Sequence, residues 1–233
     1  MFSILVLGLL LGLQHAMEAD HVAAVASLTT RGNSLRDAAL QGTAWGLGHS
    51  LTLHLVGGSV LLVDGIIGEQ LSLLLESAVG LMLILLGGDV LLQLYRKRIH
   101  FHVHSHATET HFHAHGHDAG KRHVADPHHH RHDKPLPLRS LLVGMVHGMA
   151  GSAALIVFAL GSVHSFWEGL AYIAVFGVGS VIGMATLAVV ISLPLRWSAR
   201  SLTWAHNGLT AVLGLFTLTL GFLLLHQTTQ SLI

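Results

Sequence analysis

The sequence predicts an all-helical, polytopic membrane protein with six transmembrane helices. Of its 233 residues, 52% are hydrophobic and only 10% are charged, whereas a soluble domain carries about a quarter charged residues. Six apolar stretches are each long enough to cross a hydrocarbon core of about 30 Å. The chain contains no cysteine, which excludes disulfides, thiolate metal sites and iron–sulfur clusters.

The helices are expected in two groups of three on either side of a hydrophilic loop. Residues 31–34 separate the first two helices, and Pro194 is expected to end the fifth. The chain therefore divides into a first three-helix unit at 1–95, a loop at 96–137 and a second three-helix unit at 138–233. The expected helices are about 2–29, 38–63, 70–95, 138–163, 166–193 and 202–226.

The basic residues predict how the chain lies in the membrane. All twelve lysines and arginines fall in the connections between helices one and two, three and four, and five and six. By the positive-inside rule these connections face the cytoplasm and both termini are extracytoplasmic. We therefore expect a multi-pass protein of a bacterial-type cytoplasmic (inner) membrane with the long loop inside. The formal net charge of zero gives no reason to expect a nucleic-acid partner.

Short matches suggest that the two three-helix units are related. Units with three helices each must have opposite topology, and inverted repeats with a site at their interface are a recurring transporter plan. We therefore expect a 3+3 inverted repeat. The matches are 11–17 with 143–149, which share Gly-x-x-His-x-Met, 46–48 with 177–179, and Gly80 and Gly87 with Gly214 and Gly221.

A dense polar motif lies in the first apolar stretch, His15-Ala16-Met17-Glu18-Ala19-Asp20-His21. Ionisable groups at membrane depth are costly and usually mark an ion or substrate path. Imidazole with carboxylate suits late first-row divalent metals. On a straight helix Asp20 lies about 140° from His15. Either the helix is unwound here, or the groups divide between metal ligands and partners such as Asp20 that orient an imidazole.

Single histidines in other helices extend the candidate site. His49 follows Gly46 and Gly48, which would let it approach helix one, and His147 occupies the position of His15 in the second unit. The candidate metal ligands are therefore His15, Met17, Glu18, Asp20, His21, His49 and His147. Core filling is the ordinary alternative for Met17. Weaker candidates are His54, Asp89 and His206.

The loop is rich in histidine, with long alternating runs. Such a composition is typical of metal binding, and because it cannot form a packed core we expect disorder without metal. Imidazoles alone do not discriminate nickel, cobalt, zinc and copper. The loop histidines are His100, His102, His104, His106, His111, His113, His115, His117, His123, His128, His129, His130 and His132.

The motif at 15–21 resembles the His-x4-Asp-His signature of the nickel/cobalt transporter (NiCoT) superfamily, and 47–50 resembles its second motif. The resemblance implies secondary transport of Ni²⁺ or Co²⁺, with His15, Asp20, His21 and His49 at the matched positions. The segment 147–152 is more similar to the short urease-accessory-type branch. Typical members carry a helix before the signature helix, and here the signature lies in the first one.

The function expected from these observations is a permease for Ni²⁺, Co²⁺ or both, with uptake favoured over efflux and release by rocking of one repeat against the other. Its partners would be the divalent ion, the lipid bilayer and cytoplasmic nickel chaperones. A zinc or other divalent-metal transporter, and a membrane metallochaperone or scaffold for urease or hydrogenase assembly, stay open. We expect no enzyme and no cofactor, because the intramembrane histidines are single rather than grouped as in di-iron enzymes.

Overall fold

The structure is a computed structural model that describes residues 2–30, 34–63, 68–96, 99–106, 109–116, 137–150 and 165–232. Over these ranges the chain is helical apart from one β-hairpin. The elements are α1 (Phe2–His15), α2 (Ala19–Thr29), α3 (Leu35–Val63), α4 (Glu69–Arg96), β1 (Ile99–His106), β2 (Glu109–Gly116), α5 (Leu138–Ala150), α7 (Phe166–Ser201) and α8 (Thr203–Leu232).

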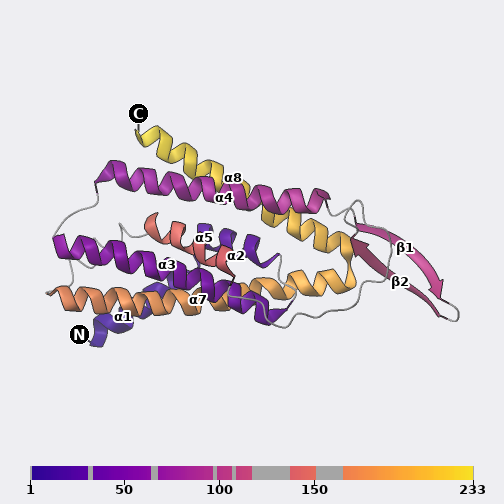
Figure 1. Cartoon of the computed structure of the whole chain (residues 1–233), viewed down its shortest axis with the longest axis horizontal. Coiled ribbons are helices and arrows are strands. Elements are labelled where there is room, and N and C mark those ends of the chain that lie inside the picture. Colours follow the sequence, from indigo (N-terminus) through magenta and orange to yellow (C-terminus); the bar gives the residue numbers. More distant parts are fainter. Residues whose placement is uncertain are drawn as a thin grey trace.

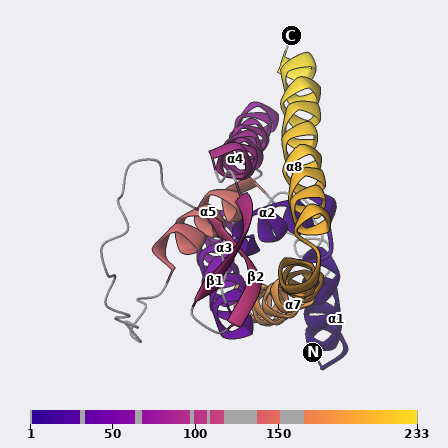
Figure 2. The same ribbon diagram turned by 90° about the vertical axis from the view of Figure 1, so that its right-hand side faces the viewer.

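The helices form an elongated bundle with α2 at its centre. Helices α3 and α7 run side by side, α4 packs along α8, α1 lies on α7 and α5 lies on α3 (Figure 1). The short helix α2 contacts α3, α4, α7 and α8, and the end-on view in Figure 2 places it between them. Ala23, Ala24, Val25 and Ala26 of this helix are at most 1% exposed, because small side chains let four helices converge on one.

Three of the described helices are long and apolar enough to cross a membrane: α4, α7 and α8. Helices α1 and α2 meet the same criterion together and add a fourth span if the bent pair is one crossing. The fold is thus that of a membrane-embedded helical protein. Helix α3 has 29 residues but is not among these candidate spans. Helix α5 is short.

Two expected helix boundaries differ from the structure. The helix expected at 2–29 is interrupted after His15 and resumes at Ala19. Pro194 does not end a helix but lies inside α7, which continues to Ser201. Proline is tolerated in membrane helices where neighbouring groups satisfy the carbonyl that it frees. The segment 151–164, expected to complete the helix that starts at Leu138, lies outside the described residues.

Glycines allow close approach between the first helix of each expected three-helix unit and the middle helix of the other. A Cβ on Gly12 would collide with the Phe176 carbonyl of α7, and a Cβ on Gly144 would collide with the Trp45 carbonyl of α3. Gly48 likewise faces the backbone of α5. The expectation that Gly46 and Gly48 let α3 approach helix one is therefore wrong, since Gly46 packs on α7.

Part of the histidine-rich loop forms a hairpin. The disorder expected for this loop does not hold over β1 and β2, which pair antiparallel and extend beyond the end of the bundle where α4 ends and α8 begins (Figure 1). The strict alternation at 100–106 and 111–116 matches the two-residue period of a strand. The register sets histidine opposite histidine at 100 and 115, 102 and 113, and 104 and 111.

Candidate metal-binding site

The break between α1 and α2 builds the site. The two helices are bent by 59° relative to each other. In the intervening turn the amide of Met17 donates to the Gln14 carbonyl at 2.9 Å and the amide of Glu18 to the His15 carbonyl at 3.1 Å. The helix is therefore unwound, as one of the two sequence interpretations required. The bend brings the His15 and His21 rings to a centroid separation of 4.2 Å.

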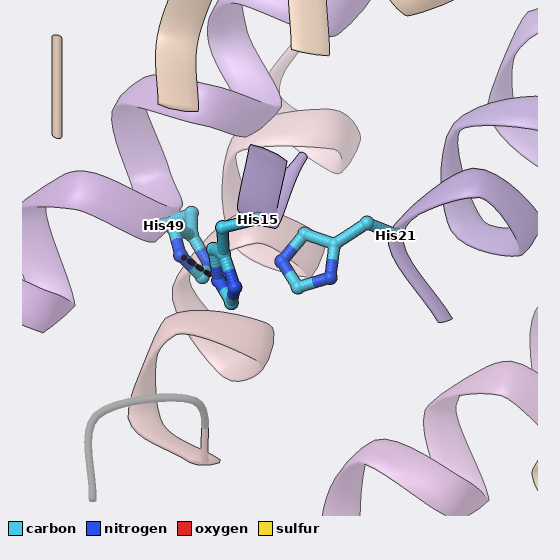
Figure 3. A group of neighbouring side chains, drawn as sticks. All are labelled: His15, His21 and His49. Atoms are coloured by element: carbon cyan, nitrogen blue, oxygen red, sulfur yellow. Dashed lines mark hydrogen bonds between the residues drawn. The ribbon is translucent and has the colours of Figure 1, made fainter. Parts of the chain in front are cut away.

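His49 from α3 completes a cluster of three imidazoles. The Nε2 atoms of His15 and His49 lie 3.3 Å apart, and the His21 ring turns its far edge toward His15 (Figure 3). One nitrogen from each ring lies within 4.8 Å of the others. Two nitrogens bound to one ion at about 2.0–2.1 Å would lie about 3.0–3.4 Å apart. The spacing between His15 and His49 therefore fits two ligands of a single ion.

Asp20 connects this cluster to a fourth histidine. Its Oδ1 accepts from Nδ1 of His21 at 2.9 Å, and its Oδ2 accepts from Nε2 of His147 in α5 at 3.0 Å. Nδ1 of His15 is similarly 3.0 Å from Oε1 of Glu18. Asp20, His21 and His147 form a second possible metal-holding group that shares His21 with the first.

The carboxylates fix which imidazole nitrogens remain available. A neutral ring that donates through one nitrogen keeps a lone pair on the other. His21 donates to Asp20 through Nδ1, so its lone pair is on Nε2, and His147 donates through Nε2, so its lone pair is on Nδ1. Among the described residues neither atom has a hydrogen-bond partner, although both are buried, and the same holds for Nδ1 of His49. A buried polar group left without a partner is costly, and a bound cation would satisfy several at once.

The four histidines of the cluster are shielded from water. His21, His49 and His147 are at most 1% exposed and His15 is 8% exposed. Trp45 covers one side, with its ring 5.3 Å from His21 and 5.5 Å from His147. Phe176 of α7 lies 5.3 Å from His15. Sequence reasoning missed both aromatic walls, because neither residue has a spacing relative to the motif that would indicate contact.

Comparison with known proteins identifies a relative of this chain. No protein-family model and no solved structure matches the chain. The chain is 35% identical over 222 residues to the urease accessory protein UreH of Bacillus sp. (strain TB-90), and the match covers 95% of this chain and 90% of that protein. The chain belongs to the UreH family. This bears out the expected likeness to a urease-accessory-type branch.

In this UreH-family chain, several residues predicted as metal ligands or weaker candidates lie outside the buried histidine cluster. Met17 is 65% exposed in the turn between α1 and α2. Nδ1 of His54 donates to the Ser50 carbonyl at 2.9 Å. Nδ1 of His206 donates to the Leu195 carbonyl at 3.0 Å, joining α8 to α7. Asp89 accepts from Arg139 at 2.7 Å.

The metal-binding role predicted for the loop histidines remains a prediction. Those in the hairpin are placed by strand register. The remainder lie outside the described residues: His117, His123, His128, His129, His130 and His132.

Proposed function

We propose that this protein is a secondary transporter that moves Ni²⁺, Co²⁺ or both across a bacterial cytoplasmic membrane, in the direction of uptake. The observation that carries the proposal is the buried cluster of His15, His21, His49 and His147 around Asp20, at the break of a helix. Broken membrane helices that present ligands near mid-membrane are a recurring feature of transporters. The urease accessory relative supports nickel, since it links the family to assembly of a metalloenzyme.

The chemistry of the site favours a borderline divalent ion over a hard or a very soft one. Neutral imidazole nitrogens suit nickel, cobalt and zinc, whereas calcium and magnesium prefer oxygen ligands. The chain has no cysteine to supply thiolate. The Asp20 carboxylate offsets part of the ion's charge and holds two imidazoles in the tautomers that leave one nitrogen each for the metal. Competition among the three metals would decide their order.

The proposal includes six membrane crossings arranged as a 3+3 inverted repeat. Its support is the reciprocity of glycine contacts. Gly12 of α1 meets the backbone of α7 as Gly144 of α5 meets that of α3. In the crossing of α4 with α8, Gly80 meets Gly221 and Gly87 meets the Gly214 carbonyl. Equivalent glycines in the two units therefore make equivalent contacts, because each packs against a helix of the other unit.

The test is metal movement by the purified protein. Proteoliposomes containing a metal-sensitive dye should report entry of Ni²⁺ or Co²⁺, and His21→Ala should abolish it. His54→Ala is the matched control, because it removes an imidazole of α3 that bonds to the Ser50 carbonyl and lies outside the cluster. Absence of movement under any imposed ion gradient, with a well-folded wild-type protein, would overturn transport.

A scaffold for delivering nickel to urease is the second candidate, favoured by the accessory relative and by the histidine-rich hairpin. The two functions place the essential histidines in different parts of the chain. Deleting residues 100–132 should leave a transporter competent to move metal into vesicles and should inactivate a scaffold. Conversely, His21→Ala should inactivate the transporter and spare a scaffold that works through its loop.

A further inference from the structure

A second polar site lies away from the histidine cluster, at the end of the bundle where α2 and α4 end and α8 begins. It is a cavity of about 50 Å³ between Thr30, which follows α2, Gln93 of α4, and three residues of α8. The α8 residues are His206, Asn207 and Thr210. A cavity of this size holds only a few water molecules, so it is too small for a fully hydrated divalent ion.

Three polar atoms at this cavity are buried and have no hydrogen-bond partner among the described residues: Gln93 Nε2, Asn207 Oδ1 and Thr210 Oγ1. Thr210 is only 8% exposed. Other threonines in these helices behave differently, since Thr217 and Thr228 each donate to a carbonyl one turn earlier, at 2.9 and 3.0 Å. The hydroxyl of Thr210 is therefore available to contact a water molecule or an ion in the cavity.

Hydroxyl-bearing residues on α2 and α8, here called the Ser27–Thr217 seam, lie along the helices between the histidine cluster and this cavity. Asp20, Ser27 and Thr30 lie within about 80° of one another around α2. Ser27 Oγ is 3.0 Å from Oγ1 of Thr217, which also lies 3.2 Å from the Ala23 carbonyl. On α8, Thr210 lies about two turns before Thr217 on nearly the same face. Ser27 and Thr217 are at most 3% exposed, so the seam is interior rather than lipid-facing.

The cavity differs from the histidine cluster in the charge of the side chains that line it. Among the described residues the cavity is lined by amide, hydroxyl and imidazole groups together with Val90 and Leu94, and by no carboxylate, so it can replace part of an ion's hydration without holding the ion tightly. The carbonyl end of the α2 dipole lies there and favours a cation. Passage through a membrane requires sites that an ion can enter and also leave. A strong cluster followed by weak neutral ligands meets that requirement.

We propose that the Ser27–Thr217 seam and the cavity at Thr210 form the inner, water-lined segment of the divalent-cation pathway, between the histidine cluster and the end of the bundle where α4 ends and α8 begins. The inference rests on the proposed transport function and assigns residues to its inner route. Gln93, Asn207 and Thr210 supply neutral ligands and contacts to water as the ion regains its hydration.

The absence of native cysteine allows a direct test by single-cysteine labelling. Thr210→Cys and Asn207→Cys in inside-out membrane vesicles are treated with Ag⁺, a thiol-reactive cation small enough to enter a cavity of about 50 Å³. Both thiols should react, and Ni²⁺ or Co²⁺ should slow the reaction several-fold. Val212→Cys is the control, because this side chain lies on the same helix and is 62% exposed on the bundle surface; it should not react in the membrane.

Two results would overturn the proposal. The first is that both thiols are inert in folded protein yet react after denaturation in detergent. The second is that both react at rates independent of metal, which would make the cavity wet but no part of the cation route. Thr210→Val should also slow transport at least several-fold while leaving equilibrium metal binding unchanged, with Thr228→Val as the matched control. If the wild-type protein transports metal but metal does not slow thiol labelling of the cysteine variants, only this inference is overturned. If the wild-type protein does not transport metal, the proposed function itself is overturned.

Discussion

Asp20 and His147 are separated by 127 positions in the sequence, yet Oδ2 of the carboxylate accepts from the imidazole Nε2 at 3.0 Å. The other carboxylate oxygen accepts from the neighbouring His21. One acidic side chain thus joins α2, from the first three-helix unit, to α5, from the second. The contact makes the histidine cluster a shared property of both units.

Asp20→Asn should weaken metal binding without removing a histidine. An amide cannot accept from both imidazoles through two oxygens, so at least one ring loses its fixed tautomer, and loss of such a partner typically costs about 10–100-fold in affinity. Equilibrium dialysis of Ni²⁺ or Co²⁺ with the purified protein would measure the change. Asp89→Asn is the control, since Asp89 pairs with Arg139 instead of the cluster. Unchanged affinity in Asp20→Asn would exclude the orienting role.

Metal affinity should fall as the pH is lowered, because imidazole binds a metal ion only in its neutral form. Protons and metal compete for the same imidazole lone pairs, so acid favours the metal-free protein and metal binding at neutral pH displaces any bound protons. The measurement is the dissociation constant as a function of pH, made on a protein lacking residues 100–132 so that loop histidines do not contribute. A flat profile would contradict imidazole ligation.

Ser27 and Thr217 should be energetically coupled. Hydrogen bonds between membrane helices contribute about 0.6 kcal/mol on average and rarely exceed about 2 kcal/mol. A double-mutant cycle with Ser27→Ala and Thr217→Val, read by reversible unfolding in detergent, should give a coupling free energy of that size. The pair Ser77 and Thr228, 2.8 Å apart between α4 and α8, is a second cycle with the same chemistry. Strict additivity of the Ser27 and Thr217 effects would show that their hydroxyls do not interact.

Gly144→Ala should destabilise the fold more than its size suggests. The new methyl group would collide with the Trp45 carbonyl, and forcing extra atoms into a packed interface costs about 1–3 kcal/mol. The thermal unfolding midpoint in detergent should fall. Gly208→Ala is the control, since nothing lies within 4 Å of that position, and replacing a helical glycine there should raise stability slightly. Equal behaviour of the two variants would contradict close helix contact at Gly144.

Composition and the motif at 15–21 were sufficient to predict a helical membrane protein with an intramembrane histidine cluster. The interruption at His15 was one of two open interpretations, because residues five positions apart cannot share a face of a straight helix. The membership of His147 was predicted from the short match between the two units.

Three features could not be predicted in the same way: the aromatic contacts with the cluster, the Ser27–Thr217 contact and the positions at which the helices end. Trp45 and Phe176 reach the cluster through tertiary packing that leaves no local pattern. Thr217 and Thr210 look like ordinary threonines in an apolar helix, and only their neighbours distinguish them. Pro194 misled because sequence rules describe an isolated helix, whereas the structure accommodates it inside a packed one.

The glycine contacts limit how the molecule can move. Helix α1 is held against the backbone of α7, and α5 against that of α3, so each unit is anchored to the opposite one at backbone distance. The rocking of one repeat against the other that the sequence led us to expect would have to break these contacts. Because of the bend after His15, α2 is a short helix at the centre of the bundle whose direction differs from that of α1. A small tilt of this one helix would move Asp20 and His21 relative to His49, and so change the ligand set while the surrounding frame stays still.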